Sequence, residues 1–317
     1  MSEAGATIGG SAGARPSVFA VWAQASRIWT LAMPAVGVLV GTLTATYYGF
    51  GLSLGRFILA DLGAVALQAA TNMINDYYDY VQGTDSFDVL SQERIGPGLA
   101  IQQGLVTPDQ LWWGGILALA FGSALGLVLV YLCGWVILLI GVLSVAAAYF
   151  YTAPPVSLAY RGLGDLAVFL FMGPGFVLGG YYVQALSFSA GVIAPAIAIG
   201  CLSSGVLQVN NIRDIDNDTA HGKRTFASII GRPSAIAELI GTDALAFAAI
   251  VAGVLARTLP WPALAVLLTV PRAVRQINLV RSAVDWRNMN DALNLTAQLH
   301  MEFGLILSAA LLLGSMW

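Results

Sequence analysis

Residues 72–85 read NMINDYYDYVQGTD and close a long apolar run. Four polar residues fall within eight positions of this stretch: Asn72, Asn75, Asp76 and Asp79. On a helix, residues four apart lie on the same face, so the four side chains share roughly one side of the last two turns. An aspartate at the centre of a membrane helix costs about 2.5 to 3.5 kcal/mol, and less near the interface. The cluster therefore indicates a bound ligand that offsets this cost, and its oxygen donors favour magnesium held together with phosphate.

The composition predicts a membrane protein. Of the 317 residues, 58% are hydrophobic and 10% are charged, with a mean hydropathy of +0.77, whereas about a quarter of the residues of a soluble domain are charged. The apolar runs are long rather than alternating, which argues against a β-barrel. Cys133 and Cys201 lie inside apolar runs, without the spacing of a disulfide framework or a metal motif. The sequence therefore predicts an all-α polytopic protein that partners the lipid bilayer and no nucleic acid.

The apolar segments predict about nine transmembrane helices around a central active-site cavity. We expect a disordered tail over residues 1–20, which are rich in small and polar residues, and a single transmembrane domain over 21–317. Several links are only a few residues long, so the segments that they join should form antiparallel hairpins. The nine segments are 28–49, 57–80, 109–132, 135–151, 164–186, 190–212, 234–256, 260–280 and 296–316.

The basic residues predict the orientation of the chain. With nine spans, twelve of the fourteen Lys and Arg residues fall on one side, and only Arg56 and Arg257 fall on the other. The positive-inside rule then predicts a multi-pass protein of the cell (inner) membrane, with the N-terminus and the active-site loops cytoplasmic and the C-terminus external. The twelve residues are Arg15, Arg27, Arg94, Arg161, Arg213, Lys223, Arg224, Arg232, Arg272, Arg275, Arg281 and Arg287.

A second polar cluster closes the sixth apolar segment. Residues 209–225 read VNNIRDIDNDTAHGKRT, in which Asn210, Asp214 and Asp218 are spaced four apart and share a helix face. The spacing repeats that of the first cluster, and both clusters fall on the predicted cytoplasmic side. A solvated interface explains one such cluster, but two matching clusters on one side indicate a shared site.

Two carboxylate-bearing helix ends that face each other suit one kind of chemistry. They can hold magnesium ions that clamp a diphosphate and make it a better leaving group. A diphosphate that leaves an allylic carbon yields a carbocation-like prenyl group, which aromatic faces stabilise. A bundle of apolar helices is also a natural channel for a long isoprenoid tail. Cations for the remaining phosphate oxygens are available at Arg94, Arg161, Arg213, Lys223 and Arg224.

Both clusters resemble the aspartate-rich motifs of the UbiA superfamily of intramembrane prenyltransferases. The matching stretches are NDYYDYVQGTD and NNIRDIDNDTAHGKRT. Three others, RIGPGLAIQQG over 94–104, YTAPPVSLAYRGLGD over 151–165 and GPGFVLGGYYVQ over 173–184, resemble the branch that prenylates 1,4-dihydroxy-2-naphthoate, the MenA-type branch. The general family pattern has an acid where Gly83 stands, so Asp85 would take its place. Leu99 stands where the branch usually carries an arginine, which puts a diphosphate contact from that position in doubt.

The resemblance implies a magnesium-dependent transfer of a polyprenyl group from polyprenyl diphosphate to 1,4-dihydroxy-2-naphthoate in menaquinone biosynthesis. The product would be a demethylmenaquinone, formed with loss of CO2 and diphosphate. The implied catalytic residues are Asp76, Asp79, Asp214 and Asp218. The implied metal ligands are Asn75, Asp76, Asp79, Asp85, Asn210, Asp214 and Asp218. The implied substrate-binding residues are Asn72, Arg94, Tyr151, Arg161, Asn211, Arg213 and Lys223.

Two alternatives stay open at this point. The acceptor could instead be homogentisate, 4-hydroxybenzoate, a porphyrinoid or a glycerol phosphate lipid. A cation-coupled transporter would also place acids in the membrane, but these would lie near mid-helix rather than at helix ends on one side.

Some single residues also have simpler explanations. Lys223 could be an interfacial anchor, and Arg161 could be the ion-pair partner of Asp165. The glycine run Gly173, Gly175, Gly179 and Gly180 is expected to permit close helix packing.

Overall fold

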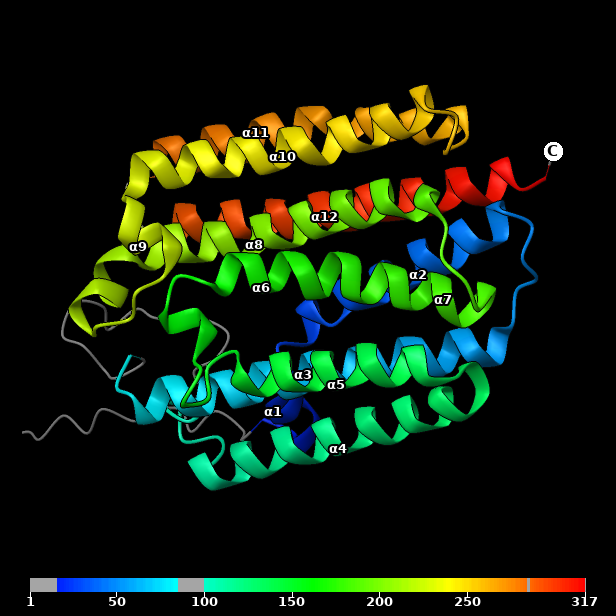
Figure 1. The fold of residues 1–317 in the computed structure, drawn as a ribbon. Coiled ribbons are helices and arrows are strands. Elements are labelled where there is room, and N and C mark those ends of the chain that lie inside the picture. The colour runs from blue at the N-terminus through cyan, green and yellow to red at the C-terminus, as the bar shows by residue number, and fades with distance from the viewer. Residues whose placement is uncertain (1–15, 85–99, 284–285, 317) are drawn as a thin grey trace, which may run out of the picture.

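The fold is a bundle of long helices that run roughly side by side (Figure 1). The computed structural model describes residues 16–84, 100–283 and 286–316. Within this part of the chain, eight helices are long and apolar enough to cross a membrane, and α5 is a shorter apolar helix, so nine segments correspond to the predicted spans. The helical elements are α1 Val18–Ala25, η1 Ile28–Thr30, α2 Ala32–Tyr47, α3 Leu54–Val81, α4 Pro108–Cys133, α5 Trp135–Phe150, η2 Leu158–Tyr160, α6 Gly164–Leu170, η3 Phe171–Leu178, α7 Gly179–Ala185, η4 Ala190–Val192, α8 Ile193–Ala220, α9 Phe226–Ile230, α10 Arg232–Leu255, η5 Trp261–Thr269, α11 Val270–Ser282 and α12 Trp286–Gly314.

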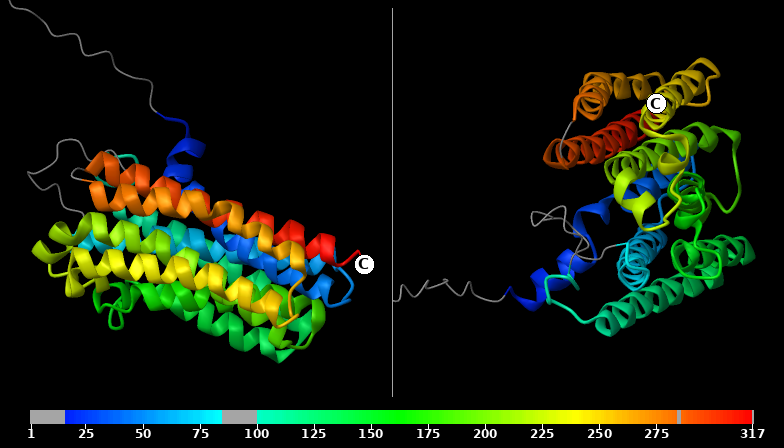
Figure 2. Two further views of the ribbon diagram at one scale, coloured as in Figure 1. Left: turned by 90° about the horizontal axis from the view of Figure 1, so that it is seen from above. Right: turned by 90° about the vertical axis from the view of Figure 1, so that its left-hand side faces the viewer.

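Successive spans alternate in direction, which brings both polar motifs to one end of the bundle. The motif-bearing ends of α3 and α8 lie near α9, on the left in Figure 1, while the C-terminus lies on the right. The view from that end shows α10, α11 and α12 on one side of the bundle and α3 and α4 on the other (Figure 2, right). This arrangement confirms the all-helical membrane fold predicted from the sequence, and it allows the two motifs to share a site.

Two helices extend well beyond their apolar segments. α8 continues to Ala220, past the predicted end at residue 212, and α12 begins at Trp286 rather than near residue 296. Hydropathy misses these turns because their side chains are polar, although helical hydrogen bonding does not depend on apolar character. The extra turns carry motif residues such as Asp218 and cavity residues such as Asn290. The functional end of the bundle is therefore helical backbone rather than loop.

The span Gly164–Ala185 contains a wide π-helical stretch, η3, flanked by α6 and α7. Pro174 lies inside η3. Proline has no N–H group, and its ring clashes with the carbonyl of the preceding turn, so the regular hydrogen-bond ladder cannot pass through it. The irregular turn is therefore a local consequence of the sequence.

The glycines of this span divide into two pairs with different roles. A Cβ on Gly173 would lie 2.4 Å from the Ala196 carbonyl oxygen of α8, and one on Gly180 would lie 2.4 Å from the Val38 carbonyl oxygen of α2. These two positions confirm the close packing expected of the run. Gly175 and Gly179 have no comparable contact among the described residues; they line an apolar cavity, whose wall Gly180 also joins.

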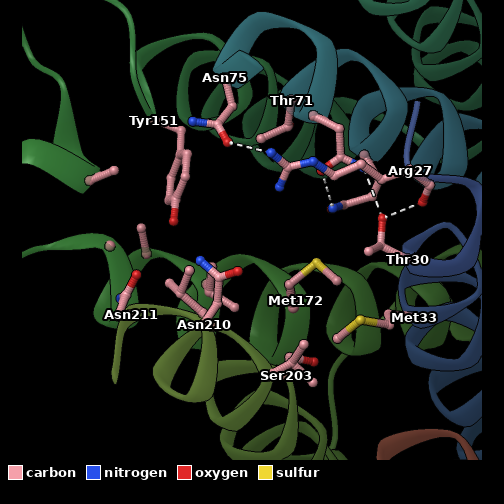
Figure 3. A pocket seen from close by; sticks show the side chains of 18 of the residues that line it. Arg27, Thr30, Met33, Thr71, Asn75, Tyr151, Met172, Ser203, Asn210 and Asn211 are labelled. Carbon is pink, nitrogen blue, oxygen red and sulfur yellow. Dashed lines mark hydrogen bonds between the residues drawn. The ribbon is translucent and has the colours of Figure 1, made fainter. Parts of the chain in front are cut away.

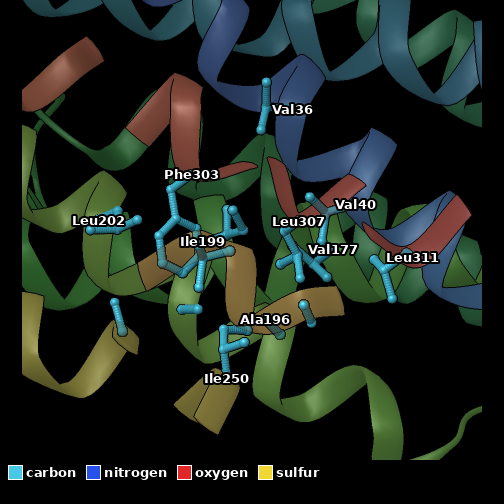
Figure 4. Close-up of a cluster of buried hydrophobic side chains, with 14 of the residues drawn as sticks. Val36, Val40, Val177, Ala196, Ile199, Leu202, Ile250, Phe303, Leu307 and Leu311 are labelled. Carbon is cyan, nitrogen blue, oxygen red and sulfur yellow. The ribbon is translucent and has the colours of Figure 1, made fainter. Parts of the chain in front are cut away.

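The largest apolar core lies between α2, η3, α8 and α12. Val36 and Val40 of α2 pack there with Ile199 of α8 and with Phe303 and Leu307 of α12 (Figure 4). In a bilayer, burying apolar side chains between helices replaces lipid contacts rather than water contacts, so close van der Waals packing drives association. The small residues that let the backbones approach are therefore as important to this fold as the large ones.

We predict that Gly41→Val destabilises the bundle by about 1 to 3 kcal/mol, the range of an overpacked core. A Cβ at Gly41 would lie 2.0 Å from the Val177 carbonyl oxygen, so α2 and the η3–α7 segment would have to separate. Thermal unfolding of the purified protein in detergent measures the change. Gly241→Val is the matched control, since a Cβ at Gly241 meets no atom of the described residues within 4 Å. Equal unfolding temperatures for the two variants would contradict the packing account.

Candidate active site

A cavity of about 530 Å³ lies between the motif-bearing ends of α3 and α8. Its lining includes polar residues of both motifs, together with Tyr151 and the cations Arg27, Arg213 and Lys223 (Figure 3 shows part of this wall). The structure therefore brings together two stretches that the sequence separates by more than a hundred residues. The motif residues in the lining are Asn72, Asn75, Asp79, Asn210, Asn211, Asp214 and Asp218.

Asp79 is the most highly connected carboxylate of the first motif. Its Oδ1 accepts a hydrogen bond from the Tyr160 hydroxyl at 2.6 Å, and its Oδ2 accepts from Lys223 Nζ at 3.2 Å and from Asn75 Nδ2 at 2.9 Å. Burial and the Asp79 charge raise the pKa of Tyr160 above its usual range, so the phenol stays protonated and donates. Lys223 Nζ also lies 5.2 Å from the centre of the Tyr160 ring. Asp79 thus joins α3 to the η2 turn and to the link after α8.

Asp76 is not among the residues that line the cavity, and it is paired with Arg27. The Arg27 guanidinium donates to Asp76 Oδ1 and, at 3.5 Å, to Asn75 Oδ1. Arg27 adopts a left-handed backbone conformation, with φ of 52°, at the junction between α1 and η1. This bend directs its side chain across the end of α3, where it lines the cavity. A cation from the start of the chain therefore compensates a carboxylate with an exposed fraction of 2%.

The second motif has its own cation. Arg213 contacts Asp214 through two nitrogens, at 2.9 Å and 2.6 Å, and donates to Asn210 Oδ1 at 2.8 Å. Its third nitrogen donates to Asn290 Oδ1 of α12 at 2.9 Å. Asp218, one turn further along α8, is buried and also lines the cavity. Arg213 thus orders the motif and attaches it to the first turns of α12.

Two further predicted substrate-binding residues meet on the α6 side of the cavity. Asn211 donates to Asp165 Oδ1 at 3.4 Å, and the Tyr151 ring projects into the cavity from the end of α5 (Figure 3). Tyr151 therefore presents an aromatic ring to the space between the two motifs.

Two residues that were predicted to bind substrate, Arg161 and Asn72, make their hydrogen bonds elsewhere in the protein. Arg161 donates to the Pro155 carbonyl oxygen at 2.7 Å, is exposed, and does not line the cavity. Asn72 lines the cavity, but its amide donates to the Ser26 carbonyl oxygen and to Thr30 Oγ1, both at 2.8 Å, and so joins α3 to the start of the first span. The predicted roles of Asp85 and Arg94, and the departure at Leu99, lie outside the described residues.

The donor set fits a divalent metal, although the acids do not form a closed cage. Carboxylate and amide oxygens are the ligands that hard cations take, and magnesium characteristically combines one or two carboxylates with phosphate oxygens. Within the described residues, no three acids, histidines or cysteines gather closely enough to hold an ion by themselves. The pairs on α3 and α8 would therefore complete a metal site only together with a bound diphosphate.

Several residues that complete the site lie outside both motifs. In the sequence, Arg27 counts only toward the topology, and Tyr160 is not among the predicted site residues. Asn290 carries no motif signal, because it lies in polar turns before the apolar part of α12. A search for cations that precede the first span could have found Arg27, whereas only the packing of helices reveals Asn290.

A second cavity of about 460 Å³ adjoins the first. It is lined mainly by apolar residues of α3, α4, α5 and the η3–α7 segment, and Leu67, Ser144 and Phe176 line both cavities. Glycines make much of its wall, at positions where a Cβ would meet open space or an ordinary contact. The glycines of this kind are Gly63, Gly126, Gly141, Gly175 and Gly179. The polar site therefore continues into an apolar crevice.

Comparison with known proteins gives the site a context. The profile of the UbiA prenyltransferase family matches residues 35–294. The 1,4-dihydroxy-2-naphthoate octaprenyltransferase of Mycobacterium tuberculosis is 34% identical over 94% of this chain and 99% of its own. The enzyme of the same name from Bacillus subtilis is 32% identical over 92% of this chain and 91% of its own.

The fold is also shared with a solved structure. The chain superposes with a TM-score of 0.59, at 15% identity, on a UbiA homologue from Archaeoglobus fulgidus bound to DMAPP and Mg²⁺, over 91% of this chain and 99% of that one. At this identity the likeness concerns the fold alone. The family profile and the long sequence matches show that this chain belongs to the UbiA prenyltransferase family.

Proposed function

We propose that this protein transfers a polyprenyl group from polyprenyl diphosphate to 1,4-dihydroxy-2-naphthoate, with release of diphosphate and CO2. The observation that carries the proposal is one cavity with motif carboxylates on two facing helix ends, three cations in its lining, and an apolar continuation. This arrangement suits an amphipathic donor with a charged head and a long apolar tail. The names of the two bacterial relatives support the choice of acceptor.

Magnesium is the proposed cofactor, held by Asn75 and Asp79 on one side and by Asn210, Asp214 and Asp218 on the other. The Mg²⁺ bound to the archaeal homologue supports this assignment. Asp76 and Asp85 stay in the proposed set as first-motif ligands. The chemistry that such ions supply when bound is neutralisation of the diphosphate, which improves it as a leaving group.

The side chains around the cavity have separate proposed tasks. Lys223, Arg213 and Arg27 line the polar part and can bind phosphate oxygens that the metal leaves open. Arg94 and Arg161 are proposed for the same role. Tyr151 offers its ring face to the positive charge that develops on the prenyl group.

The donor tail is proposed to occupy the apolar crevice between α3, α4, α5 and α7. Leu67 and Phe176 belong to both cavities, so a chain anchored by its diphosphate can pass directly into the crevice. Gly126 and Gly141 keep the crevice wide. A larger side chain at either position would project into the crevice, since a Cβ there contacts no described atom.

A transfer assay with the protein reconstituted in vesicles tests the proposal directly. Vesicles that contain the purified protein, a radiolabelled polyprenyl diphosphate and Mg²⁺ should prenylate 1,4-dihydroxy-2-naphthoate. Homogentisate, 4-hydroxybenzoate, a porphyrinoid and a glycerol phosphate lipid are tested side by side as acceptors. Transfer to one of these and not to the naphthoate would replace the proposed acceptor, and no transfer to any of them would contradict the proposal.

We predict that Asp79→Asn and Asp214→Asn each reduce transfer at least about a hundredfold, equivalent to roughly 2.7 kcal/mol, because each removes a proposed metal ligand without changing side-chain volume. Asp216→Asn is the matched control, since Asp216 is exposed and does not line the cavity. Excess chelator should abolish transfer, and Mg²⁺ should restore it. The same variants should lose the stabilisation against thermal unfolding that Mg²⁺ with inorganic diphosphate gives the parent. Near-normal transfer by both variants would contradict the two-motif mechanism.

Filling the crevice should change the preferred donor length. Gly141→Leu places a side chain in the apolar crevice, where a Cβ meets nothing within 4 Å, so transfer from a long-chain donor should fall at least about tenfold, an apolar clash of roughly 1.4 kcal/mol. Transfer from dimethylallyl diphosphate should change by less than about twofold. Gly241→Leu, at an exposed position of α10 outside both cavities, is the control. Equal losses with both donors would rule out the crevice as the tail site.

The charge distribution predicts the orientation in the membrane. A reporter fused after residue 317 should be external, and one inserted within 219–232 should be cytoplasmic, because the basic residues gather at the motif end. Accessibility of the two reporters to an impermeant reagent in whole cells measures this. A cytoplasmic C-terminus would contradict the predicted orientation.

A further inference from the structure

The α8 wall of the cavity is backed by a buried serine–histidine pair to which the proposed mechanism gives no role. The Ser203 Oγ and His300 Nε2 atoms are 3.0 Å apart, and the two residues are 1% and 0% exposed. Ser203 lines the cavity (Figure 3), whereas His300 of α12 does not. The pair therefore links the reaction cavity to a polar group within the helix bundle.

Stability alone does not explain this pair. His300 Nδ1 is buried and has no hydrogen-bond partner among the described residues, and an unsatisfied buried polar atom costs about 1 to 3 kcal/mol. The neighbouring core side chains Leu299 and Phe303 are apolar and fully buried. An apolar residue at position 300 would pack there without that cost. The imidazole therefore indicates a role at its other nitrogen, which contacts Ser203.

Ser203 retains hydrogen-bonding capacity on the cavity side. A serine hydroxyl has one donor and two acceptor positions, and the contact with His300 uses one of them. His300 also restricts the rotation of the hydroxyl group. A ligand group that reaches this wall therefore meets a hydrogen-bonding partner of defined orientation.

The surroundings of Ser203 suit an aromatic ring rather than a phosphate or a tail. Ser203 precedes Asn210 by seven residues on α8, so it lies about 10 Å deeper along the helix. Met33, Met172 and Leu207 line the same cavity, and thioethers pack well against aromatic edges. The residues that join the cavity to the tail crevice belong to α3, α5 and η3, and Ser203 is not among the residues lining that crevice.

We propose that Ser203 forms a hydrogen bond with a ring hydroxyl of the aromatic acceptor, and that His300 is a positioning residue for Ser203. This inference rests on the proposed function. In 1,4-dihydroxy-2-naphthoate the 1-hydroxyl can form an internal hydrogen bond with the neighbouring carboxylate. The 4-hydroxyl is free of that bond, and it is the group assigned to Ser203.

The test removes the Ser203 hydroxyl from the protein and the 4-hydroxyl from the ligand and asks whether the two losses have the same effect on binding. Binding of 1,4-dihydroxy-2-naphthoate and of 1-hydroxy-2-naphthoate, which lacks the 4-hydroxyl, is measured by naphthoate fluorescence under nitrogen, with Mg²⁺ and inorganic diphosphate present. The parent should bind the dihydroxy compound about tenfold more tightly, the size expected for one hydrogen bond in a buried site. Ser203→Ala should reduce this preference to less than about twofold and leave the KM for the prenyl donor unchanged.

The adjacent serine supplies a matched control. Ser204 is equally buried, but its hydroxyl donates to the Asp165 carbonyl oxygen and it does not line the cavity. Ser204→Ala should keep the tenfold preference, and His300→Phe should lose it, an effect that a purely structural role for His300 would not produce.

The possible outcomes separate this inference from the proposed function. If the parent transfers the prenyl group but shows no preference between the two naphthoates, or if Ser203→Ala keeps the preference, the Ser203 assignment is wrong and the function stands. If the parent neither prenylates nor binds either naphthoate, the proposed acceptor is wrong and the inference falls with it. A folded His300→Phe that keeps the preference removes the positioning role.

Discussion

The Asp79 carboxylate is the contact on which the functional end of the bundle depends. It receives hydrogen bonds from Tyr160, Lys223 and Asn75, which come from three different segments. A buried carboxylate is tolerated only when donors surround it, because removing its hydration costs several kcal/mol. The same donors fix the end of α3 against the link that follows α8. One electrostatic requirement therefore sets the distance between the two motifs.

Three acids of the two motifs are each paired with a cation. Arg27 pairs with Asp76, Lys223 with Asp79 and Arg213 with Asp214. Removing one partner of a buried pair leaves an uncompensated charge, which is far more costly than the loss of a surface pair. The three cations also lie in the lining of the cavity, where an anionic head group would need them.

The glycines of the fold serve two opposite purposes. At Gly41, Gly173 and Gly180 the absence of a side chain lets backbones come into contact, and this close approach holds α2 and α8 against the span of η3. At Gly126 and Gly141 it leaves open space, and a crevice results. Because both kinds of position lie in similarly apolar sequence, hydropathy alone does not distinguish packing from cavity formation.

The spans and the two motifs could be predicted from the sequence because hydropathy and helical periodicity are local properties. The sequence also predicted that Asp79 and Asp214 share a site, because both lie at helix ends on the predicted cytoplasmic side. The pairing of particular groups did not follow, since Arg27 meets Asp76 and Ser203 meets His300 across separations of 49 and 97 residues. Such contacts depend on how helices pack and rotate against one another, which no local pattern encodes. The sequence by itself determined the membrane fold and the class of chemistry, while the tertiary structure decided which cation serves each carboxylate and where the cavity ends.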